Sequence, residues 1–337
     1  KPEDEGTGIM LVVLRKEAHE LDRYDINETA HRQIAAKLGI PWKHYNRLET
    51  EQPDLCANEI NRFFSIEEKV RMLRITDGRI RAFVSDRYRA MDNAPILDAI
   101  SPVINDGREI EFLSNNISDD YMHIKALFTG DEFAQEVAKA NGTPRIIRPG
   151  FRLTNSETGC GSLKLEVFFF DGYCTNGCVF GKQEALNLSR VHHGGKLSRN
   201  DDLTVVSDYT KRKEMEYISS AFADGIRTIS TPENVSRLAE SLRVAAQTEA
   251  VKDPAAAIDV LIKDMGLNPS KRDDMLGVLY RDGDFSKFGM ASAVTEMANN
   301  ENISYAAACK IEDIGGKILT LNTNQWSRYV EAEKIAA

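Results

Sequence analysis

The chain has 337 residues, of which 42% are hydrophobic and 28% are charged, and its net charge at pH 7 is −9. This length exceeds what one hydrophobic core usually organises, so we expect two globular units. No apolar run approaches the roughly 20 residues that a membrane-spanning helix needs. We therefore expect a soluble, cytoplasmic protein that does not bind a membrane.

The five cysteines are an odd number, spread over a long chain that shows no sign of secretion. Disulfide frameworks are typical of small secreted proteins with even cysteine counts, so we expect reduced thiols. This pattern disfavours an extracellular function.

Residues 1–60 are predicted to form a helical lead-in. The stretch 28–51 has apolar residues at helical spacing, and Gly39 is placed to end the first helix before Pro41. Within this stretch, His31 is expected to be a surface or capping residue.

Residues 61–207 are predicted to form a mixed α/β core, and residues 208–337 a helical C-terminal region. In the core, short alternating runs are broken by Asp-Gly, Asn-Gly and Pro, with helices expected at 94–104 and 131–141. The later stretches have helical periodicity and are separated by Pro, Gly or Asn. The sequence thus predicts an α+β fold, a mixed, mainly antiparallel β core followed by helices.

Charge is distributed unevenly along the chain. Residues 69–90 contain 7 Lys and Arg against 2 Asp and Glu, and residues 143–200 contain 8 against 4, whereas residues 201–337 contain 16 against 22. Two basic segments in an acidic chain indicate where an anionic partner would bind.

The first basic segment contains a predicted β-hairpin. An Asp-Gly turn at 77–78 would place Arg74 directly opposite Arg81, on one face with Met72 and Phe83. Two opposed arginines repel unless an anion lies between them.

Two sources of that anion are open. The acidic block at 91–142 offers Glu109, Glu111 and several aspartates for internal ion pairs. Alternatively, a nucleic-acid backbone binds the arginines while Phe83 and Tyr88 stack on bases. The second basic segment adds arginines and a glycine-rich loop whose amides can approach an anion. The expected nucleic-acid-binding residues are Arg71, Arg74, Arg79, Arg81, Phe83, Arg87, Tyr88, Arg89, Arg148, Arg152, Arg190, His193 and Lys196.

A metal site at Cys174, Cys178, His192 and His193 is an alternative, because this cysteine spacing is admissible for zinc. An Asn-Gly turn at 176–177 would send the two cysteine side chains to opposite faces of a hairpin. We therefore expect reduced, metal-free thiols and no cofactor; a nucleophilic cysteine paired with one of the histidines is the remaining alternative.

The motifs "RAFVSDRYRAMDN", "NSETG", "CTNG" and "HHGG" occur together within residues 35–200. In this range the chain resembles the phage- and plasmid-like proteins grouped as domain of unknown function nine-three-two. The resemblance implies a bacterial mobile-element setting and brings no established activity or catalytic residue. Genes of this family often lie near replication and recombination genes, which favours a nucleic-acid partner by association.

Phosphate-loop, dinucleotide-binding, nucleophile-elbow and zinc-protease motifs are absent from the sequence, so no enzymatic activity is expected. We expect a phage- or plasmid-type protein that binds or anneals single-stranded nucleic acid in replication or recombination, with homo-oligomers possible in principle. One alternative is a mobile-element effector that binds a host or phage protein through its acidic helices. Another is a nuclease that uses Asp86 or Asp92 with a divalent metal.

Overall fold

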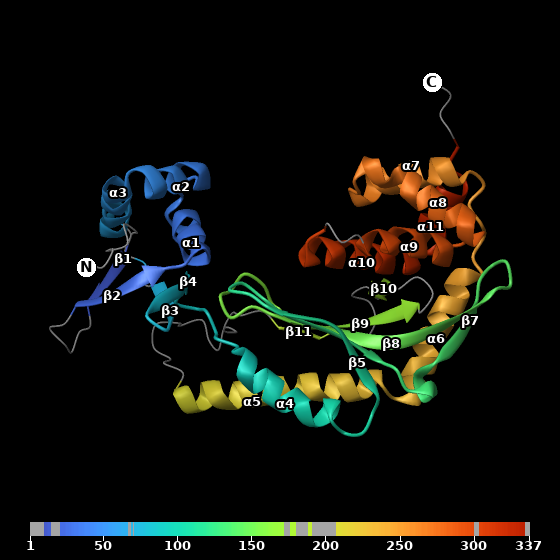
Figure 1. Ribbon diagram of the computed structural model, residues 1–337, viewed down its shortest axis with the longest axis horizontal. Coiled ribbons are helices and arrows are strands. Elements are labelled where there is room, and N and C mark those ends of the chain that lie inside the picture. Colours follow the sequence, from blue (N-terminus) through green and yellow to red (C-terminus); the bar gives the residue numbers. More distant parts are fainter. Residues whose placement is uncertain are drawn as a thin grey trace, which may run out of the picture.

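The computed structural model describes residues 10–14, 21–66, 69, 71–171, 176–179, 188–190, 207–299 and 303–333. The described strands form a four-stranded N-terminal sheet and a seven-stranded central sheet, and most helices follow in the C-terminal part (Figure 1). The protein has an α+β fold, as the sequence predicts.

The N-terminal sheet has the strand order β1-β2-β4-β3, in which only β2 and β4 are parallel. Its strands are β1 (Met10–Leu14), β2 (Leu21–Ile26), β3 (Arg71–Thr76) and β4 (Arg79–Ser85). The chain between β2 and β3 forms α1 (Glu28–Leu38), α2 (Trp42–Glu51) and α3 (Pro53–Ile66). The helices expected in 28–51 are present, β1 and β2 were not foreseen, and the arginine hairpin β3–β4 shares a sheet with β2.

The ends of α1 follow from its sequence. The Asn27 side chain accepts a hydrogen bond from Ala30 N at 2.9 Å, and Gly39 adopts φ 71°, a left-handed conformation that ends the helix. The expectation for His31 is wrong, because its side chain is buried and its Nδ1 lies 2.7 Å from Tyr45 Oη. His31 therefore lies on the face of α1 that packs against α2.

The central sheet is antiparallel throughout its described pairs, with the order β10-β9-β8-β6-β5 and with β7 on β8 and β11 on β9. Its strands are β5 (Ile110–Ile117), β6 (Met122–Phe128), β7 (Gln135–Ala138), β8 (Pro144–Asn155), β9 (Leu163–Asp171), β10 (Asn176–Val179) and β11 (Leu188–Arg190).

Two local predictions in this region are wrong. The expected helix at 131–141 is a short 3-10 turn at Asp131–Phe133 followed by β7, because pairing with β8 overrides the helical composition. The expected turn at 176–177 is part of β10, where Asn176 is opposite Asp171 and Gly177 is opposite Phe170.

One face of the central sheet carries the main core. Phe151 of β8 is opposite Val167 of β9, and both project into a cluster covered by α4 (Asn93–Ile104) and α5 (Asp208–Ile229). Figure 1 shows these two helices side by side along one side of the sheet. The helix expected at 94–104 is confirmed.

Helices α9 and α10 lie on the other side of the sheet (Figure 1). The C-terminal helices are α6 (Pro232–Ala246), α7 (Pro254–Met265), α8 (Arg272–Asp282), α9 (Lys287–Glu296), α10 (Tyr305–Leu319) and α11 (Thr323–Val330). Eight of the ten residues of α9 are buried, so other parts of the protein cover nearly all sides of this helix. No helix among the described residues has the length and hydropathy needed to cross a membrane.

A buried ion network joins α10 to the central sheet. Arg152 of β8 has a side chain that is only 3% exposed, and it contacts Glu166 of β9 at 2.9 Å together with Glu312 at 3.4 Å and Asp313 of α10. Lys125 of β6 also pairs with Glu312. The expectation that Arg152 binds nucleic acid is therefore wrong, because three internal carboxylates surround its guanidinium.

We expect Arg152→Met to lower the free energy of unfolding by about 3–5 kcal/mol, because it leaves buried carboxylates without their main cation. Urea denaturation measures the change. Arg47→Met is the matched control, since Arg47 is exposed and its ion-pair partner among the described residues is Glu51 of the same helix; it should change stability by less than about 0.5 kcal/mol. Equal effects of the two substitutions would contradict the network.

Candidate nucleic-acid interface

The arginine hairpin contains a β-bulge that changes the expected register. Ile75 is opposite Ile80 as expected, but Arg74 is opposite Ala82, so Arg81 is the additional residue in β4. Arg74 and Arg81 are therefore not directly opposed, and the expected repulsion between them is wrong.

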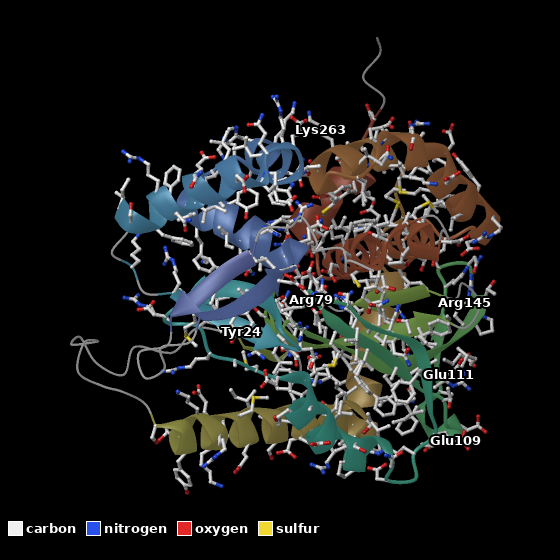
Figure 2. All side chains as sticks on the ribbon, turned by 60° about the vertical axis from the view of Figure 1, so that its left-hand side comes forward. Tyr24, Arg79, Glu109, Glu111, Arg145 and Lys263 are labelled. Carbon is white, nitrogen blue, oxygen red and sulfur yellow. The ribbon has the colours of Figure 1, made fainter. Side chains whose placement is uncertain are left out.

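Each of these two arginines has an internal carboxylate partner. Arg74 pairs with Asp92, just before α4, and Arg81 Nη1 lies 3.1 Å from Glu157 Oε2 in the turn between β8 and β9. Glu109 and Glu111, two acids that were expected as partners, lie apart from the hairpin, as their positions relative to Arg79 show (Figure 2). The internal alternative is correct for both arginines, although with different acids.

Phe83 and Tyr88 are buried and cannot stack on bases, which corrects their expected role. Phe83 is 3% exposed and packs in the cluster beneath α1 to α3, with its ring 5.6 Å from that of Phe64. Tyr88 is 5% exposed and donates a hydrogen bond from Oη to the backbone oxygen of Glu157 at 2.8 Å. Residues on both faces of β4 are buried, so the alternation of the sequence could not show which side chains reach solvent.

Glu157 also reaches the start of α4. Its Oε1 accepts a hydrogen bond from Asn93 N at 2.7 Å, at the positive end of the helix dipole. The N-cap residue Asp92 makes no such bond, because its carboxylate pairs with Arg74. Gln33 of α1 adds a further bridge, accepting from Phe83 N and donating to the Thr158 backbone oxygen, both at 2.7 Å.

A cleft of about 310 Å³ lies between the end of this hairpin and the first half of α5, and we name it the α5 cleft. Its apolar lining is provided by methionines and one isoleucine, and its charged lining comes from both sides. The lining residues are Met72, Asp86, Tyr88, Arg89, Ala90, Met91, Lys211, Glu214, Met215 and Ile218.

An exposed group of basic and aromatic side chains lies on the first half of α5, and Lys211 of this group lines the cleft. Lys211, Arg212 and Lys213 are exposed, and Tyr209 and Tyr217 are 63% and 74% exposed. From the sequence this stretch was predicted only to be a helix, because the negative net charge of residues 201–337 as a whole concealed its basic run. The signal was "YTKRKEMEY", in which two tyrosines flank a basic run at helical spacing.

The other expected binding residues fall into three groups. Arg79 and Arg87 are exposed, with Arg79 beside the turn and Arg87 just beyond the other end of the hairpin. Arg71, Arg89 and Arg148 are half-buried, and Arg148 lies 3.8 Å from Asp131. The structure gives Arg190 and Cys178 a place in strands without describing their side chains, and Cys174, His192, His193 and Lys196 lie outside the described residues.

The metal-dependent alternatives gain no support from the described part of the chain. No group of three or more His, Cys, Asp or Glu side chains there is placed to hold a metal ion. Asp92 is paired with Arg74, and Asp86 is one of the lining residues of the α5 cleft.

Comparisons of the chain with protein-family models, curated proteins and solved structures give no match. The resemblance to the domain of unknown function nine-three-two proteins therefore stays a prediction from the motifs.

We expect Arg81→Gln to lower the free energy of unfolding by about 1–3 kcal/mol, because the half-buried Glu157 carboxylate loses a charged donor. Thermal or urea denaturation measures the loss. Arg79→Gln, two residues earlier on the same strand and exposed, is the control and should stay within about 0.5 kcal/mol of the native protein. An unchanged stability of Arg81→Gln would show that the ion pair contributes nothing.

A second expectation concerns alkaline pH. Burial raises the pKa of Tyr88 to about 12, above the value near 10 of the unfolded chain. The benefit of the neutral hydroxyl is therefore complete below about pH 10 and is lost as the pH rises toward 12. Tyr88→Phe should be less stable than the native protein by about 0.5–1.5 kcal/mol at pH 8, with a difference that shrinks over this range. Parallel stability curves for the two proteins between pH 8 and 12 would refute the assignment.

Proposed function

We propose that the protein binds single-stranded nucleic acid along the α5 cleft and the exposed first half of α5. The observation that carries the proposal is the stripe Tyr209–Lys213–Tyr217, in which two exposed rings flank a lysine at successive i, i+4 positions. Exposed aromatic rings beside basic side chains bind single strands by stacking on bases and contacting phosphates.

The hairpin side of the cleft supports the same proposal. Arg89 and Lys211 both line the cleft, so basic groups from two separate parts of the chain meet there, and Arg87, two residues before Arg89, is exposed. The methionines of the cleft provide an adaptable apolar surface for the face of a base. Because the chain as a whole has a charge of −9, the acidic remainder repels nucleic acid and restricts binding to this face.

The motif resemblance adds an associational argument. A phage- or plasmid-type setting near replication and recombination genes fits a protein that binds or anneals single strands, without catalysis. The binding residues on this proposal are Arg87, Arg89, Tyr209, Lys211, Arg212, Lys213 and Tyr217.

The test is a salt titration of binding to a fluorescent single-stranded oligonucleotide. Replacing Lys211, Arg212 and Lys213 together by Gln should weaken binding and reduce the slope of log K against log salt by about 2, the value for three lost phosphate contacts on a single strand. Tyr209→Ala with Tyr217→Ala should weaken binding by about 1–3 kcal/mol per lost base stack and leave the salt slope unchanged.

The matched control replaces three other exposed lysines, Lys37, Lys43 and Lys263, by Gln. The two triple variants have the same net charge, and Lys263 lies on the opposite side of the molecule from α5 (Figure 2). Equal binding by both triple variants, or binding without salt dependence, would refute the proposed interface.

A further inference from the structure

A second cavity, separate from the α5 cleft, lies among the C-terminal helices. It has a volume of about 430 Å³ and is bounded by the end of α7, the start of α8, the end of α9 and one face of α10. We name it the α10 groove. Its floor is apolar, with Met265, Met275, Met297, Ile311 and Ile314 among its lining residues.

The groove follows from the position of α10. Residues 309, 312 and 313 of this helix contact Arg152 on the central sheet, and residues 307, 310, 311, 314 and 317 line the groove, with Asp313 at its edge. These five positions have the i, i+3, i+4, i+7 spacing of a single helix face. From residue 307 to 317 the face is about 15 Å long, or roughly three turns.

The rim of the groove is basic although the C-terminal region is acidic. Lys310 and Lys317 are exposed and form no ion pair with any described residue, and Lys271 at the start of α8 pairs with Asp274. The acid in the lining is Asp313, whose carboxylate contacts the Arg152 guanidinium. The groove therefore presents an apolar floor beside two lysines of α10 that are unpaired within the described part of the chain.

We propose that the α10 groove binds an amphipathic helix of a partner protein, with the apolar face of that helix on the floor and acidic residues beside it. Helix-in-groove recognition uses anchors at i, i+3, i+4 and i+7, which match the length and direction of the α10 face. Methionine side chains adapt to varied apolar anchors. The lysines select acidic flanks by charge complementarity and reject basic ones. This inference does not depend on nucleic-acid binding.

The test uses fluorescent peptides of about 18 residues, a length at which an isolated helix can form. The first peptide consists of Leu, Ala and Glu with leucines at helical spacing, the second has Lys at every Glu position, and the third is a scrambled form of the first. We expect the native protein to bind the first peptide, more weakly at high salt, and to bind the other two at least about tenfold more weakly.

The variant Lys310→Glu with Lys317→Glu reverses the rim charge and should weaken binding of the Glu peptide by about tenfold or more. Its matched control, Lys37→Glu with Lys43→Glu, has the same net charge and should bind as the native protein does. If melting shows that the double variant is misfolded, the two single lysine variants replace it. Equal binding of the scrambled peptide, native-like binding by the rim variants, or binding of dodecanoate without any peptide binding would each overturn the proposal.

Discussion

The rest of the structure depends on how a single residue, Glu157, is held in the turn between β8 and β9. Its carboxylate accepts from Arg81 in the bulge of β4 and from the first backbone N–H of α4, and its carbonyl accepts from the Tyr88 hydroxyl. A half-buried carboxylate is stable only when such donors replace water. The N-terminal sheet, α4 and the central sheet therefore meet at one charged group.

This junction positions the α5 cleft. The Tyr88 hydroxyl is bound to the Glu157 backbone oxygen, and Tyr88 also lines the cleft. Asp86 and Arg89, close to Tyr88 in the chain, line the cleft as well. A segment that depended only on its own loop residues would place these side chains less precisely.

The sequence predicted most helices and the longer strands of the central sheet, because their periodicity is local, but it predicted a helix over β7 and a turn at the start of β10. The hairpin register could not be predicted. The bulge at Arg81 lets residues on both faces of β4 be buried and lets Arg81 pair with Glu157, which is 76 residues away in the sequence. Equally, Arg152 and Arg87 are indistinguishable by charge, although one is enclosed by carboxylates from α10 and the other is exposed. The basic run of α5 was visible in the sequence, but averaging over 201–337 concealed it.

Local placement of charge also explains how one acidic chain presents two basic surfaces on opposite sides of its central sheet. On α10, the carboxylates of Glu312 and Asp313 pair with Arg152 and Lys125 at the sheet, so Lys310 and Lys317 are the charges of α10 on the groove side that form no ion pair with any described residue. On α5, the basic residues precede the buried half of the helix that packs on the core. In both helices the sheet-facing contacts fix which charges reach solvent, and net charge therefore says little about what either surface binds.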